Sequence, residues 1–137
     1  MKLIRHFHNI QPEHRGGVLT IGNFDGMHLG HQAMLALLRQ QAERLQTHAV
    51  LMSFNPLPHE YFAPEAGFTR LMNLREKINA LVNLPQRPDY FLLARFDHRL
   101  ACLDASQFIE QVLISHLGIR AIIIGDDFRF GKGRQGN

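Results

Sequence analysis

The sequence predicts an α/β fold, a Rossmann-like open parallel sheet with helices on both faces. Four short apolar runs in the chain are nearly continuous rather than alternating: residues 18–21, 49–54, 90–94 and 121–124. Continuous apolar runs are typical of strands that are buried on both faces of a parallel sheet. Helical patterns separate the runs, and strands that alternate with helices form right-handed crossovers within one parallel sheet.

The first helix is expected soon after the first of these runs. Residues 29–45 contain no proline and no glycine beyond Gly30. Apolar side chains at helical spacing can share one face of this helix: Met34, Leu37, Leu38 and Leu45. Residues 3–7 are a candidate for a further short strand at the edge of the sheet.

Two later helices begin with capping signals. Asn73 followed by Glu76 matches a capping box, in which two side chains satisfy free N–H groups at a helix start. Asp104 with Gln107 gives the same signal before the last helix, and Gly118 is well placed to end that helix.

The composition bounds the class of protein. The chain has 137 residues, enough for one domain, and its 45% hydrophobic and 20% charged residues are typical of a soluble globular protein. A net charge of +3 fits an anionic small-molecule ligand and is too weak for a nucleic-acid-binding surface. No apolar run is long enough to cross a membrane, and the charged residues soon after Met1 do not match a secretory signal. Cys102 is the sole cysteine, which favours a reducing compartment, so we expect a cytoplasmic protein.

The most informative stretch is residues 22–31, in which two histidines follow a glycine-punctuated strand end. His28 and His31 are one helical turn apart, so both side chains can share a face where the strand end runs into a helix. A helix start offers free backbone N–H groups and the positive end of a dipole, which together favour phosphate. Gly22 permits a tight turn, and Gly30 removes a side chain from the first turn of the helix. The stretch therefore predicts phosphate chemistry.

Two other polar segments follow strand ends, at residues 55–58 and 125–133. Ligands of an open parallel sheet bind outside the carboxyl ends of its strands, so three such segments support one shared site. Pro56 and Pro58 fix an extended loop that suits a pocket wall or simply marks a turn.

Several of these residues have a purely structural alternative. The two histidines can be partly exposed side chains at a helix start, and a zinc site lacks a third ligand at suitable spacing. Asp126 and Asp127 can hold Mg²⁺ or form an Asx turn, and Phe128 can pack at the sheet edge or stack on a flat ligand ring. Taken singly, Phe62 is expected to pack rather than to bind. Residues 131–136 match the dinucleotide pattern G-x-G-x-x-G but begin well after the strand, so we interpret them as a basic loop.

Residues 22–31 resemble the HxGH signature of the nucleotidylyltransferase superfamily. Residues 53–58, residues 70–71 with 74–77, and residues 125–131 are similar to segments of one branch, the bacterial bifunctional riboflavin kinase/FMN adenylyltransferases, or FAD synthetases. HxGH alone identifies the superfamily, whereas the PxP loop and the GDDFRFG segment identify the branch. The similarity covers essentially the whole chain.

The resemblance implies transfer of AMP from Mg²⁺-bound ATP to the phosphate of FMN, which gives FAD and pyrophosphate. It implies that His28 and His31 are the catalytic residues, which contact the ATP phosphates and stabilise charge on the leaving pyrophosphate. The ATP-binding residues that it implies are Gly22, Asn23, Phe24, Asp25, His28, Gly30 and His31. The residues that it places at the FMN pocket are Pro56, Pro58, Phe62, Asp127 and Phe128. ATP and FMN are then the substrates, Mg²⁺ enters with ATP, and no residue is assigned as a metal ligand.

The resemblance also leads us to expect that residues 1–137 are an incomplete FMN adenylyltransferase domain, cut short of the natural C-terminus. The chain lacks the later Ser-Ser/Thr-x-x-Arg signature, which helps to hold the ATP phosphates, and the riboflavin kinase domain, which phosphorylates riboflavin to FMN. We therefore expect the full-length parent to be an enzyme and the fragment to be impaired. Two alternatives stay open: a nucleotidylyltransferase for a different acceptor, and a non-catalytic nucleotide- or flavin-binding module.

Overall fold

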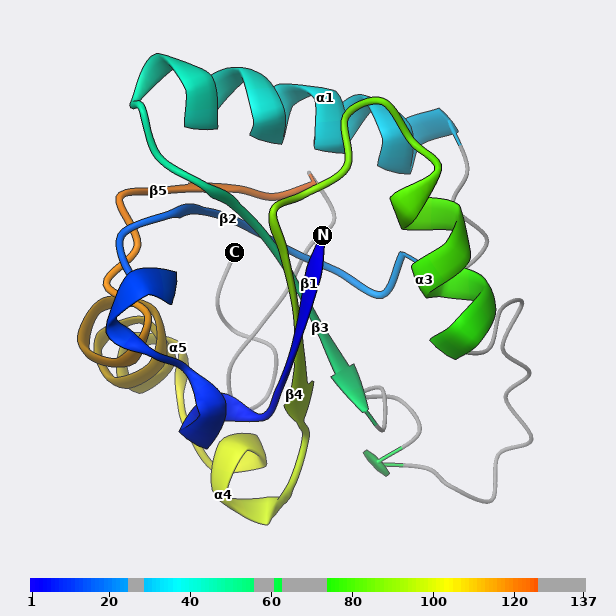
Figure 1. The fold of residues 1–137 in the computed structure, drawn as a ribbon. Coiled ribbons are helices and arrows are strands. Elements are labelled where there is room, and N and C mark those ends of the chain that lie inside the picture. The colour runs from blue at the N-terminus through cyan, green and yellow to red at the C-terminus, as the bar shows by residue number, and fades with distance from the viewer. Residues whose placement is uncertain (25–28, 56–60, 63–73, 126–137) are drawn as a thin grey trace.

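The structure is a computed structural model that describes residues 1–24, 29–55, 61–62 and 74–125. Within these residues, parallel strands form a sheet in the order β1-β4-β3-β2-β5 (Figure 1). The strands are β1 (Lys2–Arg5), β2 (Val18–Ile21), β3 (Ala49–Asn55), β4 (Tyr90–Arg95) and β5 (Ala121–Ile123). The predicted open parallel sheet is confirmed.

Helices cover both faces of this sheet. Figure 1 shows α1 (Leu29–Arg44) and α3 (Leu74–Val82) on one side, with α4 (His98–Ala101) and α5 (Ala105–Gln107) on the other. α5 continues directly into η3 (Phe108–His116), a helix with π-type hydrogen bonds. Two 3₁₀ helices lie between β1 and β2 in the sequence: η1 (Phe7–Asn9) and η2 (Pro12–His14).

Alternate residues of β2, β3 and β4 enter two separate apolar cores. The core toward α1 and α3 includes Leu35, Leu81 and, from β4, Phe91. The core on the other face includes Leu92, the next residue of β4, and Phe108 from η3. Because neighbouring residues of a strand point to opposite faces, a strand with two apolar cores must be apolar at nearly every position. This explains the continuous apolar runs of β2, β3 and β4, whereas Ile122 of β5 is 40% exposed.

The direction in which strands are added to the sheet reverses at β2. From β2 the chain passes through α1 to β3 and through α3 to β4, while β5 returns to the other side of β2. Such a reversal is a topological switch point, and open α/β sheets bind ligands there, outside the carboxyl ends of the strands. The fold therefore favours a ligand at the segment that follows β2.

The predicted boundaries are close to the observed ones, with two corrections. β2 is as predicted, and the ends of β3, β4 and β5 each differ by one residue. The edge strand is shorter than predicted, because the chain leaves the sheet at His6, where φ is 65°, and Phe7 begins η1. In α1, Leu37 is 50% exposed, whereas Leu35 and Ala42 join Leu38 in the core. The prediction that Leu37 lies on the apolar face of α1 was therefore wrong.

The capping signal of the last helix is confirmed. The Asp104 side chain accepts a hydrogen bond from the Gln107 N–H at 2.8 Å, and the Gln107 side chain accepts one from the Asp104 N–H at 3.0 Å. At the other end, Gly118 has a φ of 56° and its N–H donates to the Ile114 carbonyl at 3.0 Å. The other proposed cap, Asn73, lies outside the described residues.

Candidate functional site: the turn between β2 and α1

The turn after β2 is built around Gly22 and Phe24. The Gly22 N–H donates a hydrogen bond to the Met52 carbonyl, 3.1 Å away, so the turn starts in register with the sheet. Phe24 has a φ of 51°, in the left-handed region that phenylalanine rarely adopts, and it is only 1% exposed. A Cβ atom on residue 22 would lie 2.8 Å from the Phe24 ring, so this close approach requires glycine. Burial of the Phe24 ring therefore holds the turn in a conformation that it would not adopt by itself.

His31 lies in the first turn of α1 and contacts the same ring. The centroids of the Phe24 and His31 rings are 4.7 Å apart, and the ring planes are inclined by 37°. Because α1 begins at Leu29, the N–H groups of its first turn have no carbonyl partner within the helix and carry the positive end of the helix dipole. The His31 imidazole and the N-terminal end of α1 thus meet beside the turn, an arrangement that can bind an anion.

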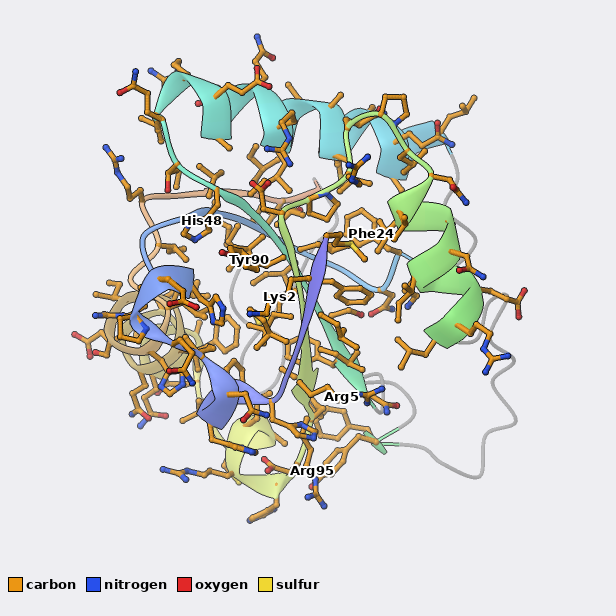
Figure 2. All side chains as sticks on the ribbon, viewed as in Figure 1. Lys2, Arg5, Phe24, His48, Tyr90 and Arg95 are labelled. Carbon is orange, nitrogen blue, oxygen red and sulfur yellow. The ribbon has the colours of Figure 1, made fainter. Side chains whose placement is uncertain are left out.

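Lys77 of α3 contacts the same turn from a second helix. Its side chain is buried, with 5% exposure, and its Nζ atom donates a hydrogen bond to the Asn23 carbonyl oxygen, 2.6 Å away. In Figure 2 Phe24 lies between α1 and α3, so residues of both helices surround the turn. A buried ammonium group therefore lies next to the candidate anion site.

Four aromatic side chains gather where β3 and β4 end: Phe54, Tyr61, Phe62 and Phe96. The Phe96 ring centroid lies 5.4 Å from Phe54, 5.3 Å from Tyr61 and 5.7 Å from Phe62, in edge-to-face contacts. Phe54 is buried, whereas Phe62 is 64% exposed. An exposed ring supported by a packed aromatic cluster is a surface on which a flat ligand ring can stack.

A second polar cluster lies at the opposite, amino ends of the strands and is structural. The Gln11 N–H donates to His14 Nδ1 at 2.9 Å, and His48 Nε2 lies 2.8 Å from the His14 carbonyl oxygen. The His14 and His48 rings each make an edge-type contact with the Tyr90 ring, whose centroid lies 4.8 Å from that of His14 and 5.1 Å from that of His48. Figure 2 shows His48 and Tyr90 together, apart from Phe24. These contacts join η2, β3 and β4 and explain the cluster without a ligand.

The family model for FAD synthetase matches residues 10–137 of the chain. The chain belongs to the FAD synthetase family. Curated relatives named bifunctional riboflavin kinase/FMN adenylyltransferase support this: those of Escherichia coli (strain K12), Pseudomonas fluorescens and Haemophilus influenzae are 46%, 43% and 46% identical to it. Each alignment covers 100% of this chain, which spans only 43–44% of the length of these relatives.

A solved structure supports the fold of this chain independently of close sequence similarity. A crystal structure described as a macrolide-efflux protein from Streptococcus pneumoniae matches it with a TM-score of 0.80 and 24% identity. The match covers 99% of this chain and 45% of that one. At this identity the likeness supports the shared architecture and nothing about activity.

The structure describes most of the residues that the resemblance assigned to ATP, without testing that role. Gly22, Asn23 and Phe24 form the turn, and Gly30 and His31 lie in the first turn of α1. Phe62 lies apart from them, in the aromatic cluster. The remaining predicted residues lie outside the described residues: Asp25, His28, Pro56, Pro58, Asp127 and Phe128.

Sequence reasoning missed two side chains that the structure adds to these sites. Lys77 lies in a segment similar to the FAD synthetases, but nothing in that segment indicates contact with a turn far away in the sequence. Phe96 is a single aromatic residue after a strand, a pattern that usually indicates packing. Both contacts join segments that are distant along the chain, so no local pattern could predict them.

Two negative findings apply to the part of the chain that the structure describes. There, no three histidine, cysteine, aspartate or glutamate side chains are grouped so that they could hold a metal ion. No helix in that part combines the length and apolar character that crossing a membrane requires.

Proposed function

We propose that the protein containing this chain is an FMN adenylyltransferase that makes FAD and pyrophosphate from ATP and FMN in the cytoplasm. The observation that carries the proposal is the turn after β2, where the His31 ring and the N-terminal end of α1 lie at the switch point of the sheet. Membership of the FAD synthetase family and the names of the relatives support this reaction over other phosphate chemistry.

In the proposed reaction, a phosphate oxygen of FMN attacks the α-phosphorus of ATP. The bond between this phosphorus and the oxygen bridging to the β-phosphate breaks, and pyrophosphate leaves with the electron pair. Such a direct transfer needs no covalent intermediate with the protein. The protein has to align the two phosphates and stabilise the charge that moves onto the leaving group.

We assign the ATP phosphates to the turn after β2 and to the start of α1. His31, together with His28, donates hydrogen bonds to phosphate oxygens, and these bonds strengthen as charge shifts onto pyrophosphate. Gly22, Asn23, Phe24, Asp25 and Gly30 line the nucleotide site. Mg²⁺ enters as part of the Mg·ATP substrate, because magnesium is commonly held by substrate phosphates and water.

We assign the flavin to the side of the site where β3 and β4 end. The exposed Phe62 ring on its aromatic support suits one face of an isoalloxazine ring. Pro56, Pro58, Asp127 and Phe128 complete this pocket in the proposal. Riboflavin phosphorylation, which the names of the relatives also mention, is assigned to sequence outside this chain.

The test measures FAD and pyrophosphate formed by the full-length protein from Mg·ATP and FMN. His28→Ala and His31→Ala should each lower kcat/KM about 100-fold or more, since each removes a donor to the developing charge. His116→Ala is the matched control and should keep normal activity, because His116 is exposed on η3 before the amino end of β5.

Normal turnover by both histidine variants would contradict the assigned roles. Absence of FAD formation by the unmodified protein would reject the proposed acceptor. Transfer of AMP to another phosphate or alcohol in a panel of acceptors would then favour the alternative nucleotidylyltransferase.

A further inference from the structure

Lys77 is buried in a position where an apolar residue would be the ordinary choice. It lies on α3 between positions that pack on the sheet, such as Leu74 and Leu81, and it is 5% exposed. Taking an ammonium group out of water is costly unless it is paired and hydrogen-bonded. A methionine of similar volume would fill the space but could not donate a hydrogen bond to the turn, which is what the lysine adds at this position.

Lys77 contacts the backbone of the candidate site. Its Nζ atom donates to the Asn23 carbonyl oxygen at 2.6 Å, and Asn23 lies between Gly22 and Phe24. Phe24 has the strained positive φ of 51°. The lysine therefore fixes the peptide that leads into the strained residue, while the ring of that residue contacts His31.

This contact also suits a phosphate site electrostatically. A carbonyl oxygen repels an anion, and a hydrogen bond from an ammonium group neutralises that oxygen and holds its direction. A positive charge surrounded by protein is screened less by solvent than an exposed one, so it acts on a nearby phosphate more strongly.

We propose that Lys77 is a positioning residue for nucleotide binding, which holds the turn after β2 through the Asn23 carbonyl and supplies a buried positive charge behind the ATP phosphates. The inference rests on the proposed function, because it takes the triphosphate of ATP as the anion at this turn. It adds a residue on a second helix, α3, to the turn and helix start already described.

The test compares Lys77→Met, which removes the charge and the donor, with Lys77→Arg, which keeps both. Lys2→Met is the matched control, because it is the same substitution at an exposed position on the edge strand β1. The dissociation constant of Mg·ATP is measured by calorimetry on the full-length protein without FMN. Steady-state KM values for ATP and FMN are measured beside it.

We expect Lys77→Met to weaken Mg·ATP binding about ten- to a hundredfold, the usual effect of losing a hydrogen bond to a charged group. The KM for ATP should rise accordingly, while the KM for FMN stays at its normal value. Lys77→Arg should recover most of the ATP affinity, and Lys2→Met should leave it unchanged. A merely structural lysine would lower thermal stability without this selective effect on ATP.

Unchanged Mg·ATP affinity in a folded Lys77→Met protein would overturn the inference, and so would an equal rise in both KM values. If that variant does not fold, hydrogen exchange of the unmodified protein decides the question. Mg·ATP should then slow exchange in residues 74–82 as well as in residues 22–24, and no change in residues 74–82 would overturn the inference.

Failure of the proposed function gives a different result. If the unmodified protein binds Mg·ATP but forms no FAD, the assigned acceptor is wrong, and the Lys77 variants still report on the nucleotide site. If FAD forms normally and Lys77→Met binds Mg·ATP normally, only the role of Lys77 is rejected.

Discussion

His14 illustrates how one buried side chain makes stability depend on pH. Burial is the main cause that lowers its pKa below the ordinary value, Lys2 and His48 lower the pKa further, and Glu13 opposes them. The geometry agrees, because His14 Nδ1 accepts a hydrogen bond from the Gln11 N–H at 2.9 Å and must be unprotonated to do so. The fold therefore stabilises the neutral imidazole.

The sign of the resulting pH dependence follows from this lowered pKa. The stabilisation is fully present above about pH 6.5, the ordinary histidine pKa, and it is lost as the pH falls from there through the lower folded value. His14→Asn keeps an acceptor near the Nδ1 position but cannot titrate. We expect urea unfolding at a series of pH values to show a smaller loss of stability between pH 7 and pH 5 for this variant. Equal losses in both proteins would contradict the prediction.

Single residues were predictable from the sequence where the reason was local. Gly22 was expected to permit a tight turn, and the 2.8 Å approach of the Phe24 ring explains why no other residue fits. The positive φ of Phe24 was not predicted, because only the buried environment of its ring stabilises that conformation. The role of Lys77 was not predicted either, since the Asn23 carbonyl to which it donates lies 54 positions away in the sequence.

At the scale of elements, Asp89 joins three parts of the fold. It lies just before β4, and its carboxylate accepts hydrogen bonds from the Ala49 N–H of β3 at 2.8 Å and from Arg39 of α1 at 3.1 Å. Burial alone would raise the pKa of this carboxyl, but the Ala49 N–H and the Arg39 guanidinium, helped by His48, hold it below the ordinary value. The ionised form therefore stabilises the contact between α1 and the sheet.

Asp89→Asn should lower the free energy of unfolding by about 1 kcal/mol at pH 7, a modest value because the side chain is 41% exposed and water screens the ion pair. A lowered carboxyl pKa gives a contribution that is complete above about pH 4 and is lost as the pH falls through the folded value. The difference between the two proteins should therefore shrink in acid, which denaturant titrations at pH 7 and pH 3 would test. Asp104→Asn is the matched control, because asparagine also caps helices well, so its effect should be small. A difference at Asp89 that does not change with pH would contradict the argument.

The elements themselves were largely predictable, because their signals are local and repeated. Burial on two faces gives continuous apolar runs, and β2 to β5 were found within one residue on that basis. The capping pair at Asp104 and Gln107 located the start of α5. The π-type hydrogen bonds of η3, such as Leu117 N–H to the Val112 carbonyl at 2.9 Å, were not predicted, since apolar spacing alone does not separate them from α-helical bonds.

At the scale of the whole molecule, the site depends on strand order rather than on any single motif. The sequence indicated that polar segments follow several strands, but only the order β1-β4-β3-β2-β5 shows that the direction reverses at β2. Long-range pairing of β2 with β5 produces this reversal, and no local pattern encodes it. The aromatic cluster at Phe96 is likewise a product of neighbouring strand ends.

A ligand bound at the turn after β2 should stabilise the whole fold against unfolding. Mg·ATP in the proposed position contacts the turn after β2 and the start of α1, which pack through one core onto β3, β4 and α3. A ligand that binds only the folded state adds about 2.7 kcal/mol of stability at a hundredfold excess over its dissociation constant. Thermal unfolding of the full-length protein should therefore shift upward with rising Mg·ATP, and the shift should be smaller for His31→Ala. Lys2→Met, on the edge strand β1, should keep the full shift. No shift at saturating Mg·ATP would mean that the turn after β2 does not bind nucleotide in the folded protein.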